Sequence, residues 1–332
     1  MMPTVGNSPA PEVVTGRSRG IAVFFSLLAA LGWASYYIFV LRISPGTSPS
    51  AILVYPFLVG GAAYAGWTVL EGHGKVFARL WSDPSAYLRT GLLVTMQFSV
   101  LAATYLTGPV DASLLSLIGD VVATPLVVAF ILGQHRAQIR SRLFAVGLVL
   151  SLAGGTMAIV GGRSLTEVHS WGWLAVPAVP LSVAFYFLLT ARANERAPPS
   201  AVVGQSMLAA GAISLLLAPL VPGGWGGIAA VTPGPFLVLV VTGLTSFFLA
   251  PALYFVALRR VGLVIPPMLM TGIPVFTLLL SAVVLGLGLP VIAILGIPVA
   301  VVGALLTLRA ERAEGPTGPA GPPPPEHTPH GP

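Results

Sequence analysis

Ten apolar segments, each long enough to cross a lipid bilayer, divide this sequence from end to end. A transmembrane helix needs about 20 mostly apolar residues to cross roughly 30 Å of hydrocarbon. The segments are Gly20–Leu41, Ser50–Leu70, Thr90–Gly108, Ala112–Gly133, Leu143–Gly161, Trp171–Ala191, Pro199–Val221, Pro235–Leu258, Val261–Gly288 and Pro290–Leu308. Lipid offers no hydrogen-bond partner to an open backbone amide, and the segments lack the alternating pattern of barrel strands. The sequence therefore predicts an all-α polytopic membrane protein with ten transmembrane helices.

The composition excludes a soluble globular protein. Charged residues make up 8 % of the chain, apolar residues 55 %, and the mean hydropathy is +0.91. A soluble domain carries about 25 % charged residues to wet its surface. The net charge of +6 does not indicate nucleic-acid binding, because the basic residues are dispersed between apolar segments and form no patch on a soluble domain. The expected surroundings are the lipid bilayer.

The positive charges predict the orientation of the chain. Cytoplasmic loops of membrane proteins carry an excess of Lys and Arg. With ten helices and the N-terminus inside, fourteen of the sixteen basic residues lie on the cytoplasmic side, and only Arg42 and Arg163 lie outside. Both termini are therefore expected in the cytoplasm, and the protein in the plasma (cytoplasmic) membrane.

The two ends of the chain differ from its body. Residues 1–19 are hydrophilic and lead directly into the first apolar segment, so we expect an uncleaved cytoplasmic segment. Residues 310–332 are rich in proline and glycine and offer no apolar face to bury. Such a composition predicts a disordered tail.

The sequence also repeats itself. WASYYIFVLR at Trp33–Arg42 resembles VAFYFLLTAR at Val183–Arg192, and Pro-Ser-Ala recurs at 49–51 and 199–201, both at an offset of 150 residues. Further along the chain the offset becomes 149, which pairs Tyr105 with Tyr254 and Pro125 with Pro274. Residues 20–162 and 163–309 then form two repeats of five helices each. Because five is odd, the second repeat enters the membrane inverted, an arrangement found in secondary carriers. The alternative is chance similarity among apolar helices.

These features resemble a known family. Two inverted five-helix halves, cytoplasmic termini and a proline in the fourth helix of each half resemble the EamA-like branch of the drug/metabolite transporter (DMT) superfamily. The stretches TGLTSFFLAPALYFVALRRVG and PPMLMTGIPVFTLLLSAVVLGL are similar to the eighth and ninth helices of that family. The resemblance covers about residues 20–309 and implies a carrier of metabolites such as amino acids, without naming its cargo.

Asp120 is the single formal charge within the ten segments. Ser113, Ser116, Asp120 and Thr124 recur at helical spacing on one narrow face. An ionisable residue inside a membrane helix costs about 2.5–3.5 kcal/mol and is usually functional. One interpretation is that Asp120 binds a cationic group of the substrate or a coupling proton. The other is structural, with Asp120 hydrogen-bonded between helices.

Aromatic and amide side chains elsewhere complete the candidate binding site. Paired across the two halves, they would surround a cavity suited to an amphipathic metabolite. Core packing or an interfacial belt is the alternative for each aromatic residue alone. The predicted substrate-binding residues are Trp33, Tyr37, Tyr55, Gln97, Thr104, Ser116, Asp120, Thr124, Tyr186, Gln205 and Tyr254.

The sequence contains no recognisable catalytic motif, and we expect no enzyme, no metal and no cofactor. No histidine or lysine lies in an apolar segment, no nucleotide-binding loop is present, and the chain has no cysteine. The predicted function is a secondary active transporter that exports small metabolites by alternating access, with proton coupling through Asp120. The alternative is a membrane protein that is not a carrier, such as a channel or a lipid scramblase.

Overall fold

The computed structural model describes residues 16–107, 109–119, 123, 141–160, 172–261, 265–288 and 291–312. The candidate residues Asp120 and Thr124 and the repeat residue Pro125 lie outside the described residues. So do residues 1–15 and 313–332, which carry most of the predicted terminal segments.

Helices account for all the regular structure in the described residues, and no strand occurs among them. The long helices are α1 (Gly16–Ile43), α2 (Pro49–Leu70), α4 (Pro84–Thr107), α5 (Pro109–Ile118), α8 (Arg142–Val160), α9 (Gly172–Asn194), α10 (Pro199–Leu217), α12 (Pro233–Thr242), α13 (Ala250–Val261), α15 (Ile273–Leu285) and α16 (Val291–Arg312). The short elements are η1 (Ser44–Gly46), α3 (Gly74–Leu80), η4 (Ala218–Leu220), α11 (Gly224–Ala229), the π-helical η5 (Gly243–Leu249) and α14 (Ile265–Met270).

The prediction of an all-α membrane protein is confirmed. Five stretches are long and apolar enough to cross a membrane: Gly20–Gly46, Pro49–Leu70, Pro84–Tyr105, Pro199–Leu220 and Pro233–Ala257. Three shorter apolar helices cover Arg142–Gly154, Ile273–Leu285 and Val291–Thr307. Each of the ten predicted segments coincides at least in part with one of the helices. The count of ten transmembrane helices and the position of the termini stay predictions.

Proline and polar caps set where several helices begin. Pro49 opens α2 directly after Ser48, whose side chain accepts a hydrogen bond from the Ala51 amide at 3.3 Å. Pro84 opens α4 after Asp83, whose Oδ1 accepts from the Ser85 amide at 2.9 Å. A proline fits the first turn of a helix because its missing N–H would have no partner there. The same residue type would break a helix interior.

The longest predicted segment is divided in two. Val261–Gly288 contains α14 and α15, which are separated by a turn at residues 271 and 272. Pro274 lies in the first turn of α15, and Gly286 ends that helix with a φ of +63°. The left-handed conformation at Gly286 is one that glycine adopts without steric cost.

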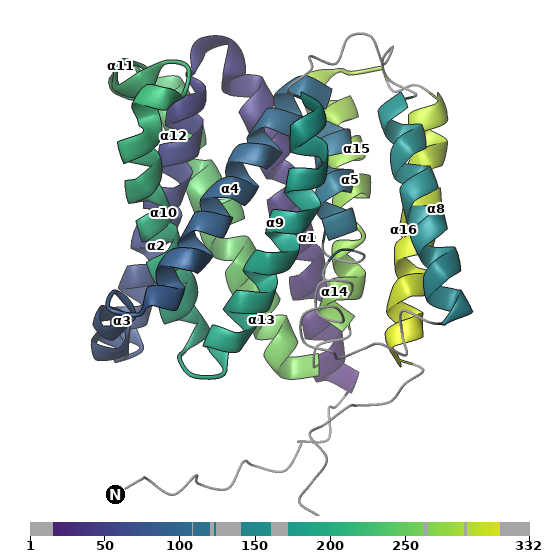
Figure 1. Cartoon of the computed structure of the whole chain (residues 1–332), viewed down its shortest axis with the longest axis horizontal. Helices are drawn as coiled ribbons and strands as arrows, with labels where there is room; N and C mark the ends of the chain where they lie inside the picture. The colour runs from purple at the N-terminus through teal and green to yellow at the C-terminus, as the bar shows by residue number, and fades with distance from the viewer. Residues whose placement is uncertain are drawn as a thin grey trace, which may run out of the picture.

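The helices form a bundle with two outer pairs (Figure 1). α8 packs on α16 along one side of the bundle, and α2 packs on α10 along the opposite side. Between them lie α1, α4, α5, α9, α13 and α15. The end of the bundle with α3 is called the α3 end below, and the end with α11 is called the α11 end.

Small residues allow the outer helices to approach closely. A Cβ atom added to Gly154 would lie 2.6 Å from the Gly296 carbonyl oxygen, and one added to Gly147 would lie 2.7 Å from the Gly303 carbonyl oxygen. The α8–α16 contact is thus between backbones. Such contacts are typical of membrane helices, where van der Waals packing replaces the hydrophobic effect.

Candidate functional site

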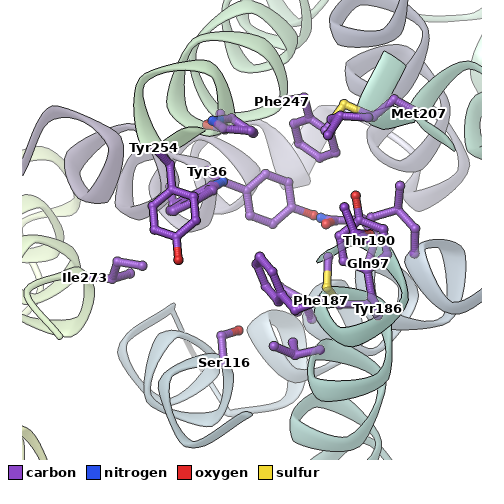
Figure 2. A pocket seen from close by; sticks show the side chains of 18 of the residues that line it. Tyr36, Gln97, Ser116, Tyr186, Phe187, Thr190, Met207, Phe247, Tyr254 and Ile273 are labelled. Atoms are coloured by element: carbon purple, nitrogen blue, oxygen red, sulfur yellow. The ribbon is translucent and has the colours of Figure 1, made fainter. Parts of the chain in front are cut away.

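A cavity lies in the middle of the bundle, between helices from both halves of the sequence (Figure 2). Its volume is about 130 Å³. Its walls are mostly apolar and aromatic. The lining residues are Trp33, Tyr36, Tyr37, Leu93, Met96, Gln97, Val100, Ser116, Val183, Tyr186, Phe187, Thr190, Val203, Met207, Ser246, Phe247, Pro251, Tyr254, Phe255 and Ile273.

Aromatic rings in contact with one another build one wall of this cavity. The Trp33 and Tyr254 rings lie with centroids 5.5 Å apart, which joins α1 to α13. The Tyr36 ring contacts Tyr37 at 5.6 Å and Phe247 at 5.7 Å. These separations and tilted or edge-on angles are those that favour aromatic pairs. The wall is therefore a rigid apolar surface against which a flat or branched apolar group can pack.

Helical periodicity brings these side chains to the cavity. On α4 the lining residues Leu93, Gln97 and Val100 recur at steps of four and three residues. On α9 Val183, Tyr186, Phe187 and Thr190 recur at steps of three, one and three. Residues three and four apart lie on one face of an α-helix. Each helix thus presents one face to the cavity.

Polar groups are few in the cavity, and they fall into two kinds. The first kind is held within the protein: the Tyr37 and Ser116 hydroxyls lie 2.9 Å apart, and the Ser246 hydroxyl donates to the Gly32 carbonyl at 2.7 Å. These bonds tie α1 to α5 and to η5.

The second kind has no hydrogen-bond partner in the part of the chain that the structure describes. It comprises Tyr36 Oη, Gln97 Nε2 and Thr190 Oγ1. Figure 2 shows the Tyr36 hydroxyl pointing across the cavity toward Gln97. Buried polar atoms are normally hydrogen-bonded, so unpartnered ones that line a cavity are suited to receive a ligand.

The structure brings together six of the residues that the sequence indicates: Trp33, Tyr37, Gln97, Ser116, Tyr186 and Tyr254 all line the cavity. Of the other five candidates, Asp120 and Thr124 lie outside the described residues, and three described ones do not line the cavity.

Tyr55, Thr104 and Gln205 do not line this cavity. The Tyr55 hydroxyl donates to the Ile228 carbonyl at 3.1 Å, near α11. The Thr104 hydroxyl donates to the Val100 carbonyl of its own helix at 2.7 Å. Gln205 is completely buried in α10, and its Nε2 atom has no hydrogen-bond partner in the described residues. Asp120 follows the cavity residue Ser116 by four positions in the sequence, and its own place is not among the described residues.

Several lining residues escaped the sequence analysis, notably Phe187, Thr190, Met207 and Phe247. Tyr186 is the repeat partner of Tyr36, and Phe187 and Thr190 follow it on the same face of the helix. The position of these two residues could therefore be predicted from the sequence. Met207 and Phe247 carry no comparable signal, because an apolar residue on an apolar helix can face lipid, a neighbouring helix or a cavity. Among the described residues no group of three or more His, Cys, Asp and Glu side chains could hold a metal ion.

Solved structures share this fold. One of them, titled "Crystal structure of protein", matches with a TM-score of 0.65 and 22 % sequence identity, over 88 % of this chain and 98 % of that chain. At this identity the likeness shows the fold alone. No protein with a curated description matches the sequence.

A family model matches the second half of the chain. The match covers residues 170–309, which include α9 to α15 and most of α16, and its description is "EamA-like transporter family". The family is part of the DMT superfamily, so the resemblance seen in the sequence is confirmed. Together with the apolar helices, the match identifies an integral multi-pass membrane protein. Residues 170–309 are thus similar to the EamA-like transporter family, which consists of membrane transporters of the DMT type.

Proposed function

We propose that this protein is a secondary active transporter that exports small organic metabolites, amino acids or related compounds, by alternating access between two inverted five-helix repeats in the plasma membrane. The observation that carries the proposal is the central cavity, eight of whose twenty lining residues form four pairs related by the sequence repeat. A carrier of this type binds its substrate near the middle of the bilayer, at the interface of its repeats.

Four pairs of lining residues are related by the repeat offset. At an offset of 150 residues, Tyr36 pairs with Tyr186 and Tyr37 with Phe187, and all four line the cavity. Trp33 pairs with Val183 at the same offset, and Gln97 with Ser246 at an offset of 149, and these four line it as well. This arrangement supports a repeat over chance similarity of apolar helices.

The contact between α2 and α10 supports the repeat independently. A Cβ atom added to Gly61 would lie 2.8 Å from the Leu208 side chain, and one added to Gly211 would lie 2.6 Å from the Leu58 side chain. Gly61 and Gly211 are 150 residues apart, as are Leu58 and Leu208. Each of the two contacts is therefore the repeat equivalent of the other. A twofold axis between α2 and α10 would relate them in this way.

The contact between α8 and α16 has the same property at the other side of the bundle. Gly154 faces Gly296 and Gly147 faces Gly303. Gly147 and Gly296 are 149 residues apart, as are Gly154 and Gly303. The offset again exchanges the two contacts.

Hydrogen bonds connect the halves at both ends of the bundle. At the α11 end, the Ser50 hydroxyl donates to the Gly224 carbonyl at 2.9 Å. At the α3 end, the Ser200 hydroxyl donates to Glu71 Oε2 at 2.7 Å. Ser50 and Ser200 are 150 residues apart. Alternating access requires that one end open while the other stays closed, and these two related contacts are the natural candidates for the closures.

The size of the cavity favours a small substrate. Its volume of about 130 Å³ is close to that of a cavity of roughly 150 Å³ that holds benzene. The aromatic wall suits an apolar side chain, and the unpartnered Tyr36, Gln97 and Thr190 suit a polar group beside it. An amphipathic metabolite of amino-acid size meets both conditions.

Counterflow in proteoliposomes tests the proposal against the alternatives. Vesicles that hold the purified chain and excess unlabelled amino acid should accumulate the labelled compound transiently, since a carrier exchanges substrate across the membrane. A channel or a lipid scramblase shows no such trans-stimulation. Equilibration without an overshoot for every amphipathic metabolite tried would refute the carrier.

The proposed role of Asp120 is tested separately. We propose that its carboxylate binds the coupling proton or the substrate's amine. Asp120→Asn should then abolish the effect of a proton gradient or weaken substrate binding. Asp111→Asn, which changes the carboxylate nearest in the sequence, serves as the matched control. Unchanged proton dependence and affinity in Asp120→Asn would leave Asp120 a structural residue.

A further inference from the structure

Arg89 is a positive charge buried inside the bundle. It lies in the second turn of α4, and only 1 % of its surface is exposed. It is the largest side chain among the fully buried residues that the structure describes. Burying an ionised group is costly unless it is paired and hydrogen-bonded. The partners of Arg89 are therefore informative.

Among the described residues, one nitrogen of the guanidinium group has a partner. Nη1 donates to the Ser85 hydroxyl at 3.1 Å and lies 3.9 Å from Asp83 Oδ2. The Asp83 side chain is 41 % exposed, and its carboxylate already accepts bonds from the Ser85 amide and hydroxyl at 2.9 and 2.7 Å. Nε and Nη2 of Arg89 make no hydrogen bond within the described residues. A buried charge is thus left half satisfied.

The unpartnered edge has a specific chemistry. Nε and Nη2 lie side by side on the guanidinium plane, and their two N–H bonds are parallel. This fork matches the two oxygens of a carboxylate, which it binds through two short charge-assisted hydrogen bonds.

Arg89 lies next to the central cavity at its α3 end. It precedes Leu93 by four residues and Gln97 by eight on α4, and both of these line the cavity. The Arg89 charge also interacts electrostatically with Tyr186, another lining residue. Thr190, one turn beyond Tyr186 on α9, lines the cavity with an unpartnered hydroxyl. Tyr186 is thus a lining residue that lies within electrostatic range of the guanidinium group.

The fold itself does not require this charge. At the repeat offset of 149, Arg89 pairs with Val238 of α12, and Pro84 at the start of α4 pairs with Pro233 at the start of α12. The equivalent helix therefore begins in the same way and has an apolar residue at this position. Only the first half of the sequence carries a charge at this position. Two nitrogens of its guanidinium group have no hydrogen-bond partner among the described residues, and the group lies near a cavity. These observations point to a ligand.

We propose that Arg89 forms a carboxylate-binding subsite at the α3 end of the cavity, with the Thr190 hydroxyl as a further donor, so that the substrates are organic acids or zwitterions with an apolar body. The inference rests on the proposed function as a carrier and assigns it a substrate class. The carboxylate binds the Nε and Nη2 edge, while the apolar body packs against the aromatic wall formed by Trp33, Tyr36 and Tyr254. Arg89 does not itself line the cavity, so neighbouring side chains must shift to admit the carboxylate.

Thermal shift on the purified full-length protein tests the subsite with matched probes of one apolar skeleton. Leucine and 4-methylpentanoate carry the carboxylate, whereas leucinamide and 3-methylbutylamine do not. A ligand that binds the folded state raises the melting temperature, so titration of the shift reports affinity. We expect leucine and 4-methylpentanoate to stabilise the unaltered protein and the two probes without a carboxylate to stabilise it at least tenfold less effectively.

Variants then assign the effect to Arg89. Arg89→Gln should weaken the binding of the two carboxylate probes by about tenfold or more, since it removes the two parallel donors of the charged guanidinium group. Arg89→Lys should recover part of the affinity, because an ammonium keeps the charge without the two parallel donors. Arg79 is an exposed residue of α3 at the same end of the bundle. Arg79→Gln removes its charge and should leave the binding of all four probes unchanged.

Two outcomes would overturn the subsite. One is that Arg89→Gln binds the carboxylate probes as well as the unaltered protein does. The other is that leucine raises the melting temperature of the unaltered protein no more than leucinamide does, whether both raise it equally or neither raises it. This second outcome does not depend on whether a variant folds. Counterflow remains a separate measurement, so a carrier of amines would keep the proposed function and lose only this subsite.

Discussion

At the scale of single residues, individual polar atoms have large consequences in this bundle because so few are present. The cavity holds the bonded pair of Tyr37 and Ser116 and, beside it, atoms without partners, including Gln97 Nε2. The bonded hydroxyls hold α1 against α5, and the unpartnered atoms are left for a ligand. A hydrogen bond gained from a buried, unpartnered donor is worth more than one exchanged with water, since the desolvation cost has already been met on folding.

We predict that Gln97→Leu raises the KM for the transported substrate by about five- to thirtyfold, which corresponds to roughly 1–2 kcal/mol for one lost hydrogen bond. The leucine has a similar volume, so the melting temperature should change little. The measurement is initial-rate transport in proteoliposomes. Thr95→Val is the matched control, because Thr95 is an exposed residue of the same helix whose hydroxyl bonds to Gly91. An unaltered KM in Gln97→Leu would remove Gln97 from the binding site.

Asp83 allows a second prediction, on stability and pH. The Ser85 hydroxyl donates to the Asp83 carboxylate and, with the Ser85 amide and the charges of Arg89 and Arg196, holds its pKa below the ordinary value of 3.8. A carboxyl group whose pKa is lowered by folding stabilises the folded state above its unfolded pKa, and this contribution disappears as the pH falls through the folded pKa. Asp83 also caps the N-terminus of α4.

Asp83→Ala should therefore lower the free energy of unfolding by about 1 kcal/mol at neutral pH, as expected for a lost N-cap. The difference from the unaltered protein should shrink as the pH is lowered below 4, where the native carboxylate becomes protonated. Unfolding curves in detergent between pH 7 and pH 3 measure both effects. A difference that stays constant over that range would contradict the assigned role of the charge.

At the scale of helices, packing rather than periodicity sets the arrangement. α8 and α16 meet where glycines leave room for backbone contact, and α2 and α10 meet in the same way through Gly61 and Gly211. In α12 and α13 the helix continues through the π-helical η5, where the Ser246 hydroxyl bonds to Gly32 of α1. A π-helical turn within a longer helix is frequent at functional sites. Here it is the segment that supplies Ser246 and Phe247 to the cavity.

The glycine contacts predict a destabilising substitution. A side chain at Gly303 would overlap the backbone of Ser151 and lie 2.6 Å from the Gly147 carbonyl oxygen. Gly303→Val should therefore separate α8 from α16 and cost about 1–3 kcal/mol of folding free energy. Gly66→Ala is the control, since a Cβ at Gly66 meets nothing within 4 Å. It should be neutral or stabilising by up to about 1 kcal/mol. Equal stabilities of the two variants, measured by unfolding in detergent, would show that the α8–α16 contact is not tight.

At the scale of the whole molecule, the bundle has two distinguishable ends. α3 lies at one end and α11 at the other, and each end carries one of the two related serine contacts between the halves. The distribution of Lys and Arg predicts that the α3 end faces the cytoplasm. Both the carrier mechanism and the carboxylate subsite depend on that orientation, because an exporter loads its substrate from inside.

Cysteine labelling tests the orientation directly, since the natural sequence has no cysteine. Lys75→Cys on the exposed surface of α3 should be protected from a membrane-impermeant maleimide in intact cells and should react after permeabilisation. Gly226→Cys on α11, where a side chain meets nothing within 4 Å, should react in intact cells. Labelling of Lys75→Cys from outside would reverse the predicted topology.

The sequence analysis anticipated the helices and the family resemblance, and six of its candidate residues line the cavity. Apolar length alone indicates membrane helices, and the repeat drew attention to Trp33, Tyr37 and Tyr186, which do line the cavity. It was less informative for Tyr55 and Gln205. Gln205 lies on α10, which contributes Val203 and Met207 to the cavity, but Tyr55 lies on α2, which contributes no lining residue.

By itself, then, the sequence determined what can be read locally along the chain: which segments lipid can solvate, where prolines begin helices, and which short motifs recur at an offset of about 150 residues. Only the tertiary structure decided which face of each helix meets the cavity and that Arg89 is enclosed beside it. The reason is that burial of a side chain in a membrane protein is not encoded by local polarity, because lipid and protein interior are equally apolar and close packing alone distinguishes them.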